Sequence, residues 1–589
     1  MGEIDGGEIL VRMLLSEGVD CVFTLHGGHL DAIFQAAVRH RLRLVDTRHE
    51  QAAGHAADGW ARTTGRIGVA IVTAGPGVTD VVTAVANAYL DCVPVLVIGG
   101  RSPLVDDEQL PLQGGFSQVD LMKPITKWSA TVTHLQRLPD YVAQALRIAT
   151  SGRPGPVFLE LPADVLFARI DESRVSLPAA YRPAMAAAPE DATVQLILDR
   201  LAAAERPVIM AGGGVWFSGA TNELRAFAER TRIPVLANGK GRACLPEDHP
   251  LSGGGFMSLA AVRQSGGPDV VLMLGARLGL FTGGAQSSFI PASAYLIQVD
   301  IEGEEIGRNR DVQTGVVADC AATLRALTNA ANTRNWPERT AWTDALRATR
   351  RGMDALFAGP ASVAAPIHPY RVARDIAAIM DRPDDVLIGD GGETAFWLEM
   401  ASTVRAPGHW LSHGYLGCLG TGLPFAIAAK IAHPQARVLC LTGDGSVGLN
   451  FAEFDTMVRH HLPVVVVVNN DQQWGMSKHG QELMYGKEHT VVTDLGCVRY
   501  DLAAAGFGCH TEYVERADDL RPAIERAFAS GRPSCINVQT DPSVIAPITL
   551  AMVGRASTES HPGTVSMPYY GERELEPAAG RTAAPQSRS

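Results

Sequence analysis

The stretch "VLCLTGDGSVGLNFAEFDTMVRHHLPVVVVVNNDQQWG", residues 438–475, places polar residues at the ends of two apolar runs. Continuous Val and Leu runs separated by a helical segment are typical of buried parallel strands. Consecutive parallel strands lie near one another, and ligands bind at their carboxyl ends. Asp444 follows the first run and Asn470 and Asp471 end the second, so we expect their side chains to converge.

These side chains offer oxygen ligands of the kind that Mg²⁺ prefers, and Mg²⁺ completes its octahedron with phosphate oxygens and water. The helix after Gly-Asp-Gly begins at the same point, and its free N–H groups favour a phosphate. The stretch therefore predicts a metal-bound diphosphate. The alternative is a plain strand-to-helix turn in which Asp444 is only a cap.

An earlier segment repeats the pattern without the acid. The strand "GVAIVTAGPG" (68–77) leads through a helix to "VPVLVIGG" (93–100), which suggests that one ancestral domain was duplicated. Residues 193–350 add a further parallel α/β pattern. Their "AGGGV" (211–215) lacks the GxGxxG spacing of a dinucleotide site.

Two Pro/Ala-rich stretches, 177–192 and 357–370, have no apolar period and are predicted to be linkers. The fold class that follows is α/β, with three Rossmann-like, doubly wound parallel-sheet domains. The predicted bounds are 1–178, 193–350 and 365–556, followed by a mobile polar tail at 557–589.

Composition narrows the function classes. The net charge of −12 over 589 residues comes without a Lys/Arg block, which argues against nucleic-acid and anionic-membrane partners. No apolar run approaches the roughly 20 residues of a membrane helix. The nine cysteines form no CxxC pair, as expected in a reducing, cytoplasmic setting. Small-molecule substrates are the expected partners.

Gly-Asp-Gly followed, one helix and one strand later, by Asn-Asp resembles the motif of the thiamine-diphosphate-dependent enzymes. The resemblance implies thiamine diphosphate and Mg²⁺ as cofactors. It makes Asp444 and Asp471 side-chain ligands of the metal and Gln473 a carbonyl donor. A register shifted by one, on Asn469 and Asn470, stays open, and Asn470 is kept among the expected cofactor contacts.

A glutamate in the first domain fits the same family. In "DTRHEQAAGHAADGWAR" (46–62), Glu50 opens a helix rich in Ala and Gly. A dry niche can raise the pKa of a carboxyl group by as much as ~3–5 units. The resemblance implies that Glu50 activates the cofactor's aminopyrimidine across a subunit interface, hence a homodimer or homotetramer. The alternative is an ordinary glutamate facing the helix dipole.

The resemblance covers nearly the whole chain, with 1–178 as pyrimidine-binding domain and 365–556 as diphosphate-binding domain. The chain is similar to the acetolactate synthase family, and within it to benzaldehyde lyase, on "LHGGHLDAIFQA" (25–36), "QVDLMKPITKW" (118–128) and "LSHGYLGCLGTG" (411–422). This implies proton-relaying roles for His29 and Gln113 and an active-site role for His413. The other implied cofactor contacts are Thr73, Gly75, Thr394, Gly417, Leu419, Gly443, Gly445 and Ser446. His29 could instead only satisfy backbone carbonyls.

The expected substrate pocket departs from benzaldehyde lyase. It comprises Gly28, Ala163, Ala395, Trp474 and Met476, where Ala163 and Ala395 replace aromatic residues, so a preference for benzaldehyde does not carry over.

The resemblance implies a reversible C–C lyase or carboligase that cleaves or forms 2-hydroxy ketones (acyloins) from aldehydes. Alternatives are an acetolactate-synthase-like enzyme that decarboxylates a 2-keto acid and transfers its acyl unit, and a 2-hydroxyacyl-CoA lyase. FAD, present in some relatives, is not expected, although it stays an option. A protein that only binds the cofactor would have no need of Glu50.

Overall fold

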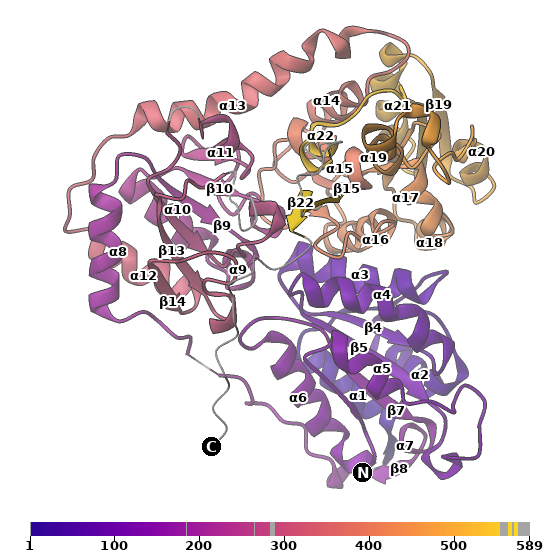
Figure 1. Cartoon of the computed structure of the whole chain (residues 1–589). Coiled ribbons are helices and arrows are strands. Elements are labelled where there is room, and N and C mark those ends of the chain that lie inside the picture. Colours follow the sequence, from indigo (N-terminus) through magenta and orange to yellow (C-terminus); the bar gives the residue numbers. More distant parts are fainter. Residues whose placement is uncertain are drawn as a thin grey trace.

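The computed structural model describes residues 2–183, 185–263, 266–282, 289–553, 564–567 and 571–574. The chain forms three α/β domains, each built around a six-stranded sheet whose paired strands are all parallel (Figure 1). The predicted fold class is therefore confirmed. We call the three the N-terminal, middle and C-terminal domains.

The N-terminal sheet has the order β3-β2-β4-β5-β7-β6, and helices flank it (Figure 1). The strands are β2 (Cys21–Thr24), β3 (Arg43–Asp46), β4 (Gly68–Val72), β5 (Val95–Arg101), β6 (Trp128–Thr131) and β7 (Val157–Pro162). The helices are α1 (Gly6–Ser16), α2 (Asp31–His40), α3 (Glu50–Thr64), α4 (Pro76–Leu90), α5 (Gln118–Met122), α6 (Leu138–Thr150) and α7 (Ala163–Leu166). A short antiparallel pair, β1 (Glu3–Asp5) with β8 (Arg169–Asp171), lies outside this sheet.

The C-terminal sheet, β16-β15-β17-β18-β20-β19, repeats the same permutation of strands, which supports the predicted duplication. Its strands are β15 (Val386–Asp390), β16 (Trp410–Ser412), β17 (Val438–Gly443), β18 (Val465–Asn470), β19 (His510–Val514) and β20 (Ser534–Gln539). Its helices are α14 (Pro369–Ile379), α15 (Gly392–Ala401), α16 (Gly422–Ala432), α17 (Asp444–Leu449), α18 (Glu453–Arg459), α19 (Gly475–Tyr485), α20 (Tyr500–Ala505), α21 (Ala517–Ala529) and α22 (Pro547–Met552).

The middle sheet has another order, β11-β10-β9-β12-β13-β14, and changes direction between β9 and β12, where open α/β sheets form a crevice. Its strands are β9 (Pro207–Ala211), β10 (Val235–Ala237), β11 (Ser252–Gly254), β12 (Val270–Leu274), β13 (Tyr295–Asp300) and β14 (Thr314–Val317). Its helices are α8 (Asp191–Ala203), α9 (Gly213–Phe217), α10 (Thr221–Thr231), α11 (Ser258–Ala261) and α12 (Cys320–Ala331).

The predicted boundary at residue 350 falls inside a helix. The 19-residue α13 (Thr340–Ala358) runs from the middle domain towards the C-terminal domain (Figure 1), so the connection is helical up to Ala358. Its apolar residues recur at helical spacing, for example Trp342 and Leu346, which are buried against the middle domain. Only the last two residues of this helix, 357 and 358, fall within the predicted linker 357–370.

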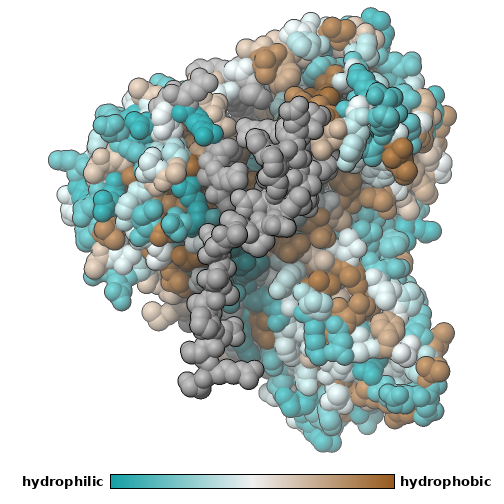
Figure 2. Space-filling model, viewed as in Figure 1, coloured by the Kyte–Doolittle hydropathy of each residue, from teal (hydrophilic) through white to brown (hydrophobic). Residues whose placement is uncertain are grey.

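The N-terminal and C-terminal domains share one hydrophobic core, which includes Ala57 and Phe158 from the first and Phe425 and Val466 from the second. Helix α3 crosses α16 closely, because a Cβ on Gly59 would lie 2.8 Å from Cδ1 of Phe425. Figure 2 shows hydrophobic residues gathered where these two domains meet on the visible face.

Most of the predicted tail, 557–589, lies outside the described residues. The described part forms an antiparallel pair, β21 (Thr564–Met567) with β22 (Gly571–Glu574). Within the described ranges, no helix has both the length and the apolar character to cross a membrane. All nine cysteines are free thiols.

Candidate active site

The two strand ends singled out in the sequence lie side by side. Strand β17 pairs in parallel with β18, and Gly443 is the register partner of Asn469. Asp444 therefore starts α17 directly beside Asp471, and the two carboxyl groups lie within hydrogen-bonding reach of each other. Of the side chains expected to converge, those of Asp444 and Asp471 lie together in the structure.

The surroundings of these two carboxyl groups fit a bound cation. Asp444 is only 2% exposed; its Oδ1 accepts the Gly445 N–H at 3.0 Å, and its buried Oδ2 has no hydrogen-bond partner among the described residues. Burial raises the pKa of both carboxyl groups, and the charge of Asp471 raises the pKa of Asp444 further. Two buried like charges with an orphaned oxygen fit a bound Mg²⁺.

The register of the metal ligands can be judged from the side chains. Gln473 Nε2 donates to Asp471 Oδ2 at 3.2 Å and to the Pro542 carbonyl at 2.8 Å, so Gln473 lies beside the carboxyl pair. Asn470 instead donates to Asn537 Oδ1 and to the Val498 carbonyl, both at 3.0 Å. The expectation that Asn470 contacts the cofactor therefore needs correction, because its amide is used inside the sheet. The geometry favours Asp471 and Gln473.

A cavity of about 2660 Å³ opens in front of these residues. Most residues proposed for the C-terminal half of the site line it: Thr394, Ala395, His413, Gly417, Leu419, Gly443, Asp444, Gly445, Ser446, Asp471, Gln473, Trp474 and Met476. The same cavity extends to the middle domain, where Gly212–Gly214, Lys240 and Arg277 line it. Burial lowers the pKa of His413, whose Nδ1 has no hydrogen-bond partner among the described residues.

Small residues allow close packing around the cavity. A Cβ on Gly445 would lie 2.6 Å from the Trp474 ring, and one on Gly392 would lie 2.6 Å from Sδ of Met476. Gly445 and Gly392 therefore make room for the two expected pocket side chains.

A second cluster lies at the carboxyl end of the N-terminal sheet. A Cβ on Gly77 would lie 3.0 Å from Cγ2 of Thr73 and 3.5 Å from Oε1 of Glu50. Gly75, with φ of +64°, would bring a Cβ within 2.9 Å of the Cβ of Gln113. These side chains therefore share one small region, although they come from separate segments.

Two of the other expected residues extend this end of the sheet. A Cβ on Gly100, at the end of β5, would lie 3.1 Å from the Cβ of His29. Gly28 precedes His29 in the same 3₁₀ turn, and Ala163 starts α7 directly after β7. Gly28 has open space where a side chain would be.

Burial sets the electrostatics of this cluster. Glu50 is 7% exposed, and burial raises the pKa of its carboxyl group. Burial lowers the pKa of His29, which favours the neutral imidazole. Thr73 Oγ1 and Gln113 Oε1 are buried without a hydrogen-bond partner among the described residues. Such orphaned polar atoms are expected where a polar ligand binds.

The two clusters do not line one common cavity. Among the described residues that line the cavity at Asp444, none is Glu50, His29, Gln113, Thr73 or Gly75. One chain therefore presents two partial sites, one at the carboxyl end of each terminal sheet.

Two buried polar residues, Glu393 and His479, were missed in the sequence, whereas Asn469 was considered there only in the shifted register of the metal ligands. Asn469 lines the cavity and donates to Thr394 Oγ1 at 3.4 Å. Glu393 accepts from His479 at 3.0 Å, and His479 lies 3.3 Å from Gln473. The Glu393–His479 pair joins distant segments and leaves no local pattern in the sequence.

Comparison with known proteins gives matches along the chain. Residues 4–123 match the N-terminal TPP binding domain of the thiamine pyrophosphate enzymes, 194–327 the central domain and 390–538 the C-terminal TPP binding domain.

Relatives match over nearly the whole length. A "Probable acetolactate synthase" of Mycobacterium bovis is 37% identical, covering 92% of this chain and 96% of that protein. A "Probable acetolactate synthase large subunit" of Methanocaldococcus jannaschii is 32% identical, with 92% and 93% covered. The "Acetolactate synthase isozyme 1 large subunit" of Escherichia coli is 31% identical, with 91% and 94% covered. These matches support the predicted family and give no support to a particular likeness to benzaldehyde lyase.

Proposed function

Because this chain belongs to the thiamine pyrophosphate enzymes, we propose that it is a carboligase that takes an acyl unit from a 2-keto acid and joins it to a second carbonyl compound. The observation that carries the proposal is the full-length similarity to proteins named acetolactate synthases. This replaces acyloin cleavage, the main expectation from the sequence, by what had been its alternative.

The residues at hand support binding of the cofactor. Asp444 Oδ2, which has no hydrogen-bond partner within the described ranges, and Asp471 would hold Mg²⁺, and Gln473 lies beside them. Thr394, Gly443 and Ser446 line the cavity where the diphosphate would lie. When bound, thiamine diphosphate supplies a nucleophilic carbon that adds to carbonyl groups.

The N-terminal cluster supports proton handling. In its buried position the Glu50 carboxyl group holds a proton to higher pH than an exposed glutamate, which suits hydrogen bonding to a ring nitrogen. A neutral His29 could transfer a proton at a substrate oxygen, and the Gln113 amide, whose Oε1 has no hydrogen-bond partner among the described residues, could hydrogen-bond there.

The two partial sites support a homodimer in which Glu50 of one subunit completes the site at Asp444 of the other. Among the described residues, neither cluster alone combines the Asp444–Asp471 pair with the Glu50 carboxyl group. The loop that carries Gln113 also exposes Leu110 and Leu112 by 82% and 81%, which suits burial against a second copy.

A second candidate is the lyase or carboligase that acts on acyloins and aldehydes without decarboxylation. His29 and Gln113, placed at the same end of the sheet as Glu50, favour it, since proton transfer at a substrate hydroxyl group is what acyloin cleavage requires.

Product analysis separates the candidates. The purified protein with thiamine diphosphate and Mg²⁺ is incubated with pyruvate, with acyloins, with small aldehydes and with a 2-hydroxyacyl-CoA, beside a Glu50→Gln control. We expect CO₂ release with formation of acetolactate, and loss of both in the control. Acyloin cleavage or aldehyde coupling without CO₂ would replace the proposal by the second candidate. Turnover of the thioester alone would contradict both.

The part of the cavity in the middle domain could hold a second cofactor, FAD. The cavity reaches the crevice of the middle domain, and Gly212–Gly214, Lys240 and Arg277 line that part. A glycine turn beside cationic side chains suits a phosphate-containing ligand. Absorbance near 450 nm in the purified protein would reveal a bound flavin.

A further inference from the structure

The turn after α4, Asp91 and Cys92, is contacted by all three domains. Asp91 is 5% exposed and Cys92 has a left-handed backbone, with φ of +55°. The N-terminal domain contributes Arg62 to this turn, and the middle domain contributes Lys240, whose Nζ lies 3.6 Å from Asp91 Oδ2.

The Asp91 carboxylate binds a loop of the candidate active site. Its Oδ1 accepts the backbone N–H of Tyr415 at 3.1 Å, and its Oδ2 lies 2.8 Å from Nη1 of Arg62. A Cβ on Gly414 would overlap the Asp91 carboxylate, so the loop lies directly on it. Arg62 Nη1 also donates to the Ser412 carbonyl at 3.4 Å.

The contacted segment, which we call the 412–420 loop, joins β16 to α16. Three expected site residues lie in it and line the cavity: His413, Gly417 and Leu419. Its far end is held within its own domain, since Asp390 accepts the N–H groups of Gly420 and Gly422, each at 3.1 Å. The near end, by contrast, depends on side chains of the N-terminal domain.

The anchor itself is a buried ion network. Arg62 donates to Asp58 at 2.7 and 3.1 Å, and Asn87 donates to Asp58 at 2.7 Å. Burial would raise the pKa of Asp91, but Lys240 and Arg62 hold it below its usual range, so the carboxylate stays charged. A buried charge with this many partners has one favoured position.

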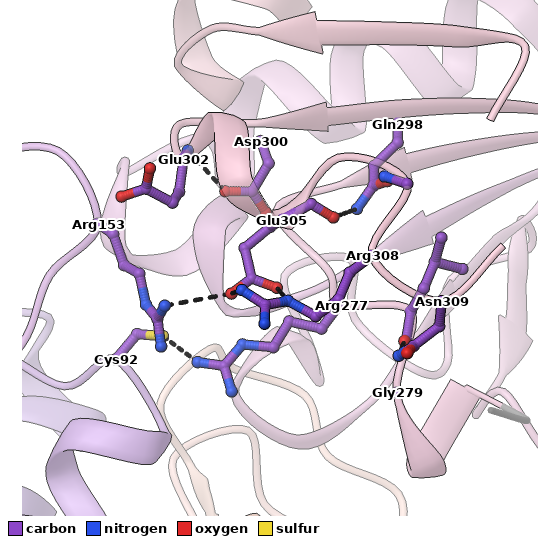
Figure 3. Close-up of polar contacts among 12 residues, drawn as sticks. Cys92, Arg153, Arg277, Gly279, Gln298, Asp300, Glu302, Glu305, Arg308 and Asn309 are labelled. Atoms are coloured by element: carbon purple, nitrogen blue, oxygen red, sulfur yellow. Dashed lines mark hydrogen bonds and ion pairs between the residues drawn. The ribbon is translucent and has the colours of Figure 1, made fainter. Parts of the chain in front are cut away.

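The next residue ties the turn to the middle domain. Cys92 Sγ accepts from Arg153 Nε at 3.0 Å and from Arg277, and Arg153 also pairs with Glu305 at 3.1 Å. Figure 3 shows the two guanidinium groups converging on the thiol from opposite domains. Arg277 in turn lies over the Tyr415 ring, 5.4 Å from its centroid.

We propose that Asp91, held by Arg62, is a positioning residue that fixes the 412–420 loop and thereby places His413, Gly417 and Leu419 for the bound cofactor. The inference rests on the proposed thiamine diphosphate site. It deepens that proposal, because it makes the cofactor-binding half of the site dependent on a side chain of the other terminal domain in the same chain.

The test compares Asp91→Asn with Asp385→Asn. Asn at position 91 keeps an acceptor for the Tyr415 N–H but removes one of the two carboxylate charges, Asp58 and Asp91, that pair with Arg62. Asp385 is also a buried partner of an arginine, Arg437, but it precedes β15, at the opposite end of the strand from the site. Arg62→Lys keeps a positive charge but loses the guanidinium group that bonds Asp58 and Asp91 together. This variant replaces Asp91→Asn in the test if Asp91→Asn does not fold.

Two readouts are taken on the intact protein: hydrogen exchange of the peptide covering 412–420, and the Kd of thiamine diphosphate with Mg²⁺. In Asp91→Asn we expect exchange of the loop to rise and the Kd to rise, each by about tenfold, with kcat at saturating cofactor reduced less than cofactor affinity. Asp385→Asn should change neither, although both variants lose thermal stability.

The inference is overturned if loop exchange and cofactor Kd stay at wild-type values in Asp91→Asn, or in Arg62→Lys where that variant is used. It is also overturned if Asp385→Asn changes them equally, since the effect would then be general destabilisation. If the wild-type protein does not bind thiamine diphosphate, the proposed function is contradicted instead. Hydrogen exchange of the 412–420 loop would still test whether Asp91 fixes that loop.

Discussion

The carboxyl group of Asp444 combines burial, a close acidic neighbour in Asp471 and an oxygen without a partner among the described residues. Each of these destabilises the folded protein unless a cation is bound, because like charges in a dry site repel. The arrangement of Asp444 and Asp471 therefore lowers the stability of the folded protein when no metal is bound.

Asp444→Asn should therefore separate metal binding from folding. We expect the variant without metal to be at least as stable as the wild type, because one buried charge is removed. The rise in melting temperature on adding thiamine diphosphate and Mg²⁺ should be lost, since ligand stabilisation follows affinity. Calorimetry with and without these additions, and after EDTA treatment, measures both effects. An undiminished rise in the variant would show that Asp444 is not a ligand.

Glu50 carries a different expectation, because its carboxyl group lies in the other cluster. Glu50→Gln keeps the shape of the side chain and removes its acid function, so carboligation should fall by about 10²-fold or more. Binding of thiamine diphosphate with Mg²⁺ should stay within about threefold of wild type. Steady-state rates and titration of the cofactor check the two parts, and a variant that keeps its activity would remove Glu50 from the mechanism.

Helices α1 and α2 are joined through one buried acid, Glu8. Burial would raise its pKa, but His40, Arg39 and Arg12 lower it to about 2. A folded-state pKa below the unfolded value of 4.5 means that this stabilisation is complete above about pH 4.5 and is lost as the pH falls towards about 2.

Glu8→Gln should therefore cost about 1–2 kcal/mol at pH 7, since its partners Arg12, Arg39 and His40 are partly exposed. The difference in melting temperature from the wild type should narrow below about pH 4.5. Glu172→Gln is the control, because Glu172 pairs with the same Arg12 at 2.8 Å but is 41% exposed. A difference in melting temperature that stays constant as the pH falls from about 4.5 to about 2.5 would contradict this account.

The crossing of α3 and α16 offers a further test, because it joins two domains. Gly59 leaves no room for a side chain against Phe425, so Gly59→Val should destabilise the protein by about 1–3 kcal/mol through overpacking. Gly448→Ala is the control, since nothing lies within 4 Å of its added Cβ. Thermal unfolding compares the two, and equal stability of Gly59→Val and the wild type would mean that the crossing adjusts freely.

The elements of the fold were predictable where local pattern determines them. The Val and Leu runs identified β17 and β18, and the strand ends located Asp444 and Asp471, because strand geometry and parallel pairing follow from sequence. The contact of Asp91 with the 412–420 loop was not predictable, since Asp91 and Tyr415 are 324 residues apart and meet only through domain packing. Only the i,i+4 pair Asp58 and Arg62 left a local sign of a buried ion pair.

The two clusters lie on two sheets, one in each terminal domain, that share the same order of strands. A duplication explains why both lie at carboxyl ends. It also explains why the two domains differ at this turn. The C-terminal domain has the acid of the Gly-Asp-Gly turn, and the N-terminal domain has Gly75-Pro76-Gly77 instead. The account requires that each active site combine the N-terminal cluster of one subunit with the C-terminal cluster of another.

Complementation between inactive subunits tests this requirement most directly. Glu50→Gln and Asp444→Asn subunits, each inactive alone, are co-expressed with different tags, and carboligation is measured on the doubly purified protein and on the unsorted mixture. A mixed dimer would hold one intact and one doubly altered site, so a random mixture should recover about a quarter of wild-type activity. No recovery in verified mixed dimers would mean that both clusters act within one chain, and would contradict the account.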